Sequence, residues 1–254
     1  MGYAIGFFYL YIRNLFYRID IFFQITRLNS VITEQKLDPE VNFGLKTKER
    51  LKELIFERLS RFLLYGSFFY VFCLFTSVIA AYFFGYSILT HYISDLGRQA
   101  VFPFSWLHDA FCVFAGLISV PVTVSFSKKL KVRYKDSKHS LLFAKIGLVS
   151  GVFGNLGLVF VGIFSLDRAG PDQIYHGISA FFAFSGIAVS IFFFSLNIVL
   201  SHKCNLKKLG AYGLVVPLVL LVLNCIVVTP IFEWLLYYSI IAYILVLDCY
   251  VFIK

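Results

Sequence analysis

Six long apolar stretches, separated by short polar connections, dominate the chain. They cover about residues 62–86, 106–126, 141–166, 175–200, 210–229 and 231–253. Each approaches or exceeds the roughly 20 residues that an α-helix needs to cross the hydrocarbon core of a bilayer, and none of the connections could hold a soluble domain. The pattern therefore predicts an all-α, polytopic membrane protein whose residues 62–254 form a six-transmembrane helix bundle.

The first 61 residues follow a different pattern. Residues 1–26 are apolar and aromatic, but Arg13, Arg18 and Asp20 interrupt them. This predicts an aromatic helix lying in the membrane interface, with an additional span as the alternative. Residues 27–61 carry charges of both signs, and Leu and Ile recur at helical spacing in their second half, which predicts a cytoplasmic amphipathic segment. Such a segment serves either as a solvated linker or as a docking site for a protein partner.

Composition and charge support the membrane assignment. A chain that is 59% hydrophobic and 15% charged has more apolar surface than one soluble core of 254 residues could bury. The net charge of +9 alone would suit a nucleic-acid partner, but the basic residues are concentrated in short loops between apolar stretches, so no nucleic-acid binding is expected.

The basic residues also predict the orientation in the membrane. Only Arg98 and Arg168 occur in the connections after the first and third stretches. The connections after the second and fourth stretches carry nine basic residues: Lys128, Lys129, Lys131, Arg133, Lys135, Lys138, Lys203, Lys207 and Lys208. Because Lys and Arg are enriched on the cytoplasmic side, both the N-terminus and the C-terminus are expected in the cytoplasm.

Unusual polar residues then gather on the extracytoplasmic face. If residues 91–97 are helical, His91 and Asp95 lie one turn apart, a spacing that suits a shared metal ion or an imidazole oriented by a carboxylate. Asp167 and His176 could form the opposite wall of the same site. His91, Asp95, Asp167 and His176 are therefore candidate metal ligands and, together with Ser94, candidate ligand-binding residues.

The same residues also allow a purely structural interpretation. Ser94 and Asp95 can cap a turn, Gly97 can end it, and the loop carboxylates can be hydrated or paired with Arg98 and Arg168. No HExxH, GxSxG, P-loop or dinucleotide-binding pattern is present in the sequence. The patterns therefore identify no catalytic residue and no cofactor.

The interior of the spans does not resemble an ion pathway. Asn155, Asn197 and Asn224 are uncharged and are predicted to join helices by hydrogen bonds. Lys145 and Asp248 fall near the cytoplasmic ends of their spans, where they are expected to reach water. A transporter is therefore the weaker prediction, and Asp248 is the residue that would revive it.

Two segments resemble a known family. The segment at 92–97, YISDLG, and the segment at 160–184, FVGIFSLDRAGPDQIYHGISAFFAF, are similar to the six-span proteins of domain-of-unknown-function family 998, which resembles the wider Frag/DRAM/Sfk group. The resemblance covers about residues 60–253. Its matching positions are Ile93, Ser94, Asp95, Gly97, Gly162, Phe164, Asp167, His176, Gly177 and Ala180. It implies the six-span fold and an association with lipid handling, with membrane lipids as partners, but no particular reaction.

Two functional hypotheses from different classes are compatible with these patterns. In the first, the protein handles lipids and has a site for a polar headgroup or a cation on its extracytoplasmic face. In the second, it is a non-catalytic scaffold or a subunit of a larger complex that docks a partner through residues 1–61. A transporter and a metal-dependent lipid hydrolase are less favoured.

Overall fold

The computed structural model describes residues 62–133, 138–169, 173–200 and 206–253, and the predictions made for residues 1–61 lie outside these ranges. The described residues are mostly helical and contain no β-strand. Six helices are long and apolar enough to cross a membrane: Phe62–Tyr82, α3 (Ser105–Arg133), α4 (Lys138–Ile163), α5 (Ile174–Leu200), α6 (Lys207–Val227) and α7 (Pro230–Ile253). The predicted all-α, six-span class is confirmed.

One difference from the predicted boundaries is at the end of the first span. The helix ends at Tyr82 and not at residue 86, because Phe83, Phe84 and Gly85 form a turn. The N–H of Phe84 donates to the carbonyl of Ala81 at 2.9 Å. Gly85 has a φ of +88°, a left-handed conformation that glycine adopts without a side-chain clash. The chain thus leaves the helix earlier than its hydrophobicity suggests.

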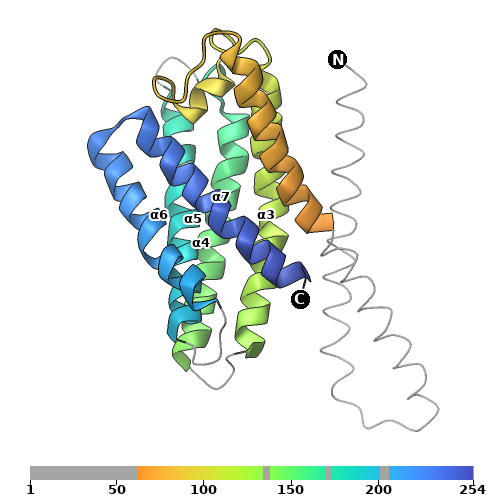
Figure 1. Cartoon of the computed structure of the whole chain (residues 1–254), viewed down its shortest axis with the longest axis vertical. Coiled ribbons are helices and arrows are strands. Elements are labelled where there is room, and N and C mark those ends of the chain that lie inside the picture. Colours follow the sequence, from red (N-terminus) through yellow and green to blue (C-terminus); the bar gives the residue numbers. More distant parts are fainter. Residues whose placement is uncertain (1–61, 134–137, 170–172, 201–205, 254) are drawn as a thin grey trace, which may run out of the picture. The chain divides into compact units, whose positions relative to one another are not determined.

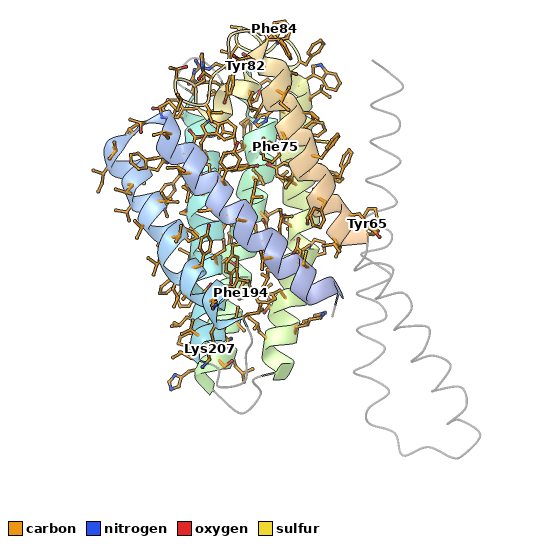
Figure 2. All side chains as sticks on the ribbon, in the orientation of Figure 1. Tyr65, Phe75, Tyr82, Phe84, Phe194 and Lys207 are labelled. Carbon is orange, nitrogen blue, oxygen red and sulfur yellow. The ribbon has the colours of Figure 1, made fainter. Side chains whose placement is uncertain are left out.

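Successive helices run in opposite directions, so the connections alternate between two ends of the bundle (Figure 1). One end holds the connection 83–104, which contains the short 3₁₀ helix η1 (Ile93–Gly97), and also the α6–α7 turn. We call this the η1 end. Tyr82 and Phe84 lie at the η1 end and Lys207 lies at the opposite end (Figure 2). Helix α7 crosses the faces of α3, α4 and α5 (Figure 1).

Helix α4 is the centre of the packing, because its glycines allow neighbouring helices to approach closely. A Cβ atom on Gly154 would lie 2.8 Å from the backbone carbonyl carbon of Gly186 in α5. On the other side, a Cβ atom on Gly116 of α3 would lie 2.5 Å from the carbonyl oxygen of Asn155. Small residues that let helix backbones meet are typical of membrane interfaces. Helices α3, α4 and α5 therefore form one tightly packed layer.

Lipid-facing positions carry large apolar side chains. On the helix Phe62–Tyr82, Tyr65, Phe72 and Ile79 are exposed, and α6 exposes a run of valines together with Ile226. A surface of this kind would be unfavourable in water but is compatible with acyl chains. These exposed rows are consistent with the predicted transmembrane character of the bundle.

Polar residues inside the bundle differ in how they are satisfied. Asn155 Nδ2 donates to Thr123 Oγ1 at 3.0 Å, and Asn197 Nδ2 donates to the carbonyl of Ser140 at 2.8 Å, so both join helices as predicted. At Asn224 it is the backbone carbonyl that accepts, from the N–H of Val228.

The prediction that Asp248 reaches water is wrong. Its exposed fraction is 0%, because the helical face on which it lies is turned into the bundle and not toward the bundle's end. Distance from the end of a span therefore does not determine whether a polar side chain is hydrated.

We expect Gly154→Ala to destabilise the protein by about 1–3 kcal/mol, because the added methyl group must separate α4 from the backbone of α5. Thermal unfolding of the detergent-purified protein measures the effect. Gly177→Ala, also on a helix but with no atom within 4 Å of the added Cβ, is the matched control and should be neutral or slightly stabilising. Equal melting temperatures for the two variants would contradict the proposed role of the α4–α5 contact.

Candidate functional site

The connection from Phe83 to Phe104 folds over the η1 end of the bundle and is anchored by apolar side chains. Ile93 and Leu96 of η1 are buried in one cluster with Trp234 of α7. The Trp234 indole N–H donates to the backbone carbonyl of His91 at 3.1 Å. These contacts attach η1 to the beginning of α7.

A buried tyrosine fixes the backbone before η1. The Tyr86 hydroxyl donates to the carbonyl of Tyr92 at 2.8 Å. Burial, together with the nearby Asp95 carboxylate, raises the pKa of Tyr86 above its ordinary value, so the hydroxyl keeps the proton that it donates. The path of the chain into η1 is therefore held by a neutral hydrogen bond.

Asp95 and His91 are occupied by local contacts. Asp95 Oδ2 accepts the N–H of Tyr92 at 2.8 Å, which caps η1, and Asp95 Oδ1 pairs with Arg98 Nε at 3.4 Å. Because η1 begins at Ile93, His91 precedes it and does not share a helical face with Asp95. The Nδ1 atom of His91 instead accepts the N–H of Ser87 at 3.2 Å.

Asp167 has a local role as well. Its Oδ2 atom accepts the N–H of Gln99 at 2.7 Å, which links the α4–α5 connection to the residues after η1. Across the described residues, no group of three or more His, Cys, Asp or Glu side chains is placed to hold a metal ion. The expected four-residue metal cluster is therefore not assembled in this part of the chain.

Arg168, in the α4–α5 connection, binds to Asp109 of α3 and to the end of α4. Arg168 Nη2 lies 2.8 Å from Asp109 Oδ2 and also donates to the carbonyl of Gly162, at 2.7 Å. Asp109 is buried, so the ion pair and its hydrogen bonds offset the cost of removing the carboxylate from water. Gly97 permits the close contact with η1, since a Cβ atom there would lie 2.9 Å from Asp109 Oδ1.

Below η1 lies a cavity of about 90 Å³, which we call the outer cavity. Its walls come from the helix Phe62–Tyr82, α3, α4, α5 and α7, and Ile93 and Ser94 of η1 line it as well. The ionisable side chains in its lining, His108, His176 and Glu233, come from the first turns of α3, α5 and α7. The rest of the lining is mainly aliphatic and aromatic. The outer cavity thus has ionisable side chains at the η1 end and is mainly apolar farther inside, where Ser67, Ser119 and Asn155 are polar.

The two histidines present different groups to the outer cavity. His176 Nδ1 lies 2.9 Å from the carbonyl of Phe164, and because a carbonyl only accepts, Nδ1 carries the proton. Nε2 of His176 is left for the cavity. His108 Nε2 contacts Cys112 Sγ at 3.6 Å, and His108 lies close enough to His176 to interact with it electrostatically. Glu233 lies beside the backbone N–H of Ser94.

Three helix N-termini converge on this end of the outer cavity. The positive ends of the α3, α5 and α7 dipoles favour negative charge, whereas the unprotonated Nε2 of His176 accepts a hydrogen bond. Glu233 provides a carboxyl group, which can pair with a cationic group, in the same region. The combination suits a group that carries both a negative and a positive charge.

The structure brings together only part of the predicted site. Ser94 and His176 line the outer cavity, whereas His91, Asp95 and Asp167 do not. His108 and Glu233 complete the polar end, although sequence patterns did not select them. The available signal was the occurrence of an ionisable residue in the first turn of an otherwise apolar span, a position that places the side chain just below the connecting loops.

Comparison with known proteins adds no further constraint. No family model, curated protein or solved structure matches this chain. The resemblance to the family 998 proteins therefore stays a prediction, and the site is defined by its own geometry.

We expect Arg168→Gln to destabilise the protein by about 1–3 kcal/mol, because it leaves the buried Asp109 carboxylate without its cation. Thermal unfolding provides the measurement. In the double variant with Asp109→Asn, most of this loss should be recovered, since no charge remains to be compensated. Additive losses in the double variant would contradict a direct coupling between the two side chains.

Proposed function

We propose that the protein handles lipids by binding one amphiphilic molecule, with its headgroup at the η1 end and an acyl chain in the outer cavity. The observation that carries this proposal is the change in lining along the cavity, from ionisable side chains below η1 to apolar side chains deeper in the bundle. Pockets with a mainly apolar wall and a few polar groups are typical small-molecule sites. A soluble polar substrate would leave the apolar part unused.

The headgroup expected at this site is zwitterionic, such as a phosphate joined to an amine. His108 and the three helix N-termini would contact the phosphate, because they offer hydrogen-bond donors and positive dipole ends, and Nε2 of His176 would accept a hydrogen bond from the amine. Glu233 would contact the amine. The backbone N–H of Ser94 lies beside Glu233, so the same end of η1 borders both parts of the headgroup.

Access for the acyl chain would be from the bilayer, between α7 and the α3–α5 layer. Helix α7 contacts α3 and α5 at few positions, while α3, α4 and α5 pack closely together. Small residues in the lining, Ala115, Ala180 and Ala183, leave the space that a chain would occupy. A lipid could thus be reached from the membrane without opening the η1 end.

Lipid analysis of the detergent-purified protein tests this function. Mass spectrometry of wild-type protein should find one retained lipid class, and His176→Ala should lose most of it because the headgroup loses a hydrogen-bond partner in the cavity. Ala115→Leu should also reduce retention, by filling the apolar part.

His91→Ala is the matched control, since it removes the same side chain at the same end of the bundle but outside the outer cavity. It should retain lipid like the wild type. Retention that is unchanged in both His176→Ala and Ala115→Leu, with all variants folded, would exclude the outer cavity as the lipid site.

We also propose that the η1 end faces the extracytoplasmic side, which is supported by the concentration of Lys and Arg in the connections at the other end. Gln99 and Lys207 are exposed at the two ends. A Gln99→Cys variant should react with a membrane-impermeant maleimide in intact cells, and Lys207→Cys should react only after permeabilisation. Wild-type protein, without an introduced cysteine, measures the background labelling of the native cysteines. The reverse labelling pattern would overturn the proposed orientation.

A further inference from the structure

Asp248 is a buried carboxylate that the proposed lipid site does not use. It is fully buried in α7, and neither of its oxygen atoms has a hydrogen-bond partner among the described residues. The Ser67 hydroxyl is close to Asp248, but its hydrogen bond goes to the carbonyl of Leu63, at 3.3 Å. Ionisable residues within membrane spans are costly to bury and commonly mark functional sites.

Asp248 lines a second cavity, of about 40 Å³, which we call the inner cavity. It lies between α3, α4, α5 and α7 and shares Ser119, Asn155, Ile187 and Ile244 with the outer cavity. A site that holds one water molecule needs roughly 10–15 Å³ by this kind of measure, so the inner cavity has room for a small ion and accompanying water.

Two hydroxyl groups that line the inner cavity use their hydrogens within the protein, so their oxygen lone pairs are available to a bound ion. The Thr123 hydroxyl donates to the carbonyl of Ser119 at 2.8 Å, and the Ser190 hydroxyl donates to the carbonyl of Gly147 at 2.6 Å. Asn155 Nδ2 donates to Thr123 Oγ1. The hydroxyl hydrogens of Thr123 and Ser190 are therefore directed at protein acceptors, which leaves oxygen lone pairs of both residues available. An ionised Asp248 adds two further acceptors.

An ionised Asp248 would have no basic side chain beside it among the described residues that line the inner cavity. As far as the described residues define the lining, it contains no Lys, Arg or His, and Asp248 is its single acidic residue. Phe126, Phe194 and Leu247 cover much of the remaining wall, which limits hydration. A set of oxygen ligands with one negative charge suits a hard cation that carries one positive charge.

We propose that the inner cavity binds a monovalent alkali cation, with Na⁺ as the expected ion and Asp248 as its charged ligand. Asn155 and Ser119 provide neutral oxygens from α4 and α3. This site is separate from the lipid function proposed above and does not depend on it.

The inner cavity lies next to the outer cavity along α7. Glu233 and Asp248 both lie on the face of α7 that lines the cavities, together with Tyr237, Ile240 and Ile244. Fifteen residues of helix place the two carboxylates about 22 Å apart along α7. Because the two cavities share Ser119, Asn155, Ile187 and Ile244, they are adjacent inside the bundle.

The test is ion-dependent stability of the full-length protein purified in detergent without sodium. Choline chloride is replaced stepwise by NaCl at constant ionic strength, and the unfolding temperature is measured. The wild-type unfolding temperature should rise and then saturate, because an ion that binds only the folded state stabilises it. In Asp248→Asn, which keeps the size of the side chain but removes its charge, the rise should be absent. KCl in place of NaCl measures selectivity.

Asp167→Asn is the control for general charge effects, since it removes a carboxylate at the η1 end outside the inner cavity, and its sodium response should match the wild type. If Asp248→Asn does not fold, Ser119→Ala provides the second variant and should shift the response to higher sodium concentration. A wild-type unfolding temperature that is the same in NaCl, KCl and choline chloride would overturn the proposal, as would a sodium response that persists in Asp248→Asn.

Discussion

The close backbone contact between α4 and its two neighbours determines how the rest of the bundle is arranged. Gly154 and Gly186 allow α4 and α5 to touch with almost no side-chain atoms between them, and Gly116 does the same between α3 and α4. Helix α7, in contrast, contacts α3 and α5 at only a few positions. The space that remains is the pair of cavities between α7 and the α3–α5 layer.

Carboxylates at the η1 end have hydrogen-bond partners, whereas polar groups in the cavities are left partly unpaired. At the η1 end, Asp95, Asp109 and Asp167 each find a nearby N–H or guanidinium group, so their burial or ordering is compensated locally. Within the cavities, His176 and Asp248 keep unused capacity to bind. An unpaired polar group costs free energy in a low-dielectric interior. Such a group is therefore a better indicator of a binding site than a high density of charged residues.

Hydrophobic pattern was sufficient for the fold, because crossing a bilayer imposes a length and a composition that are visible residue by residue. The site was harder to predict. Sequence patterns favoured His91 and Asp95 for their spacing, but Asp95 is used to cap η1 and His91 lies before the helix begins. Which face of a helix meets a cavity depends on rotation and packing, and nothing in the sequence around Asp248 distinguishes a buried face from a hydrated one.

The resemblance to the family 998 proteins can be viewed in the same terms. Of its matching residues, Asp95 caps the turn that closes the η1 end, while Ser94 and His176 line the outer cavity. A short motif of this kind can therefore combine residues that shape the protein with residues that line a cavity. Similarity in the turn alone would carry information about the fold and little about the ligand.

The two tryptophans differ in their surroundings, so one of them can serve as an intrinsic fluorescence probe. Trp106 has an exposed fraction of 51% at the start of α3, whereas Trp234 has one of 2%, follows Glu233 and is bonded to the His91 carbonyl. Tyr238 lies 5.3 Å from the Trp234 ring, between centroids. In a Trp106→Phe variant, the remaining indole fluorescence would come from Trp234, which packs against η1. Spectral changes at this contact could then be followed without attaching a dye.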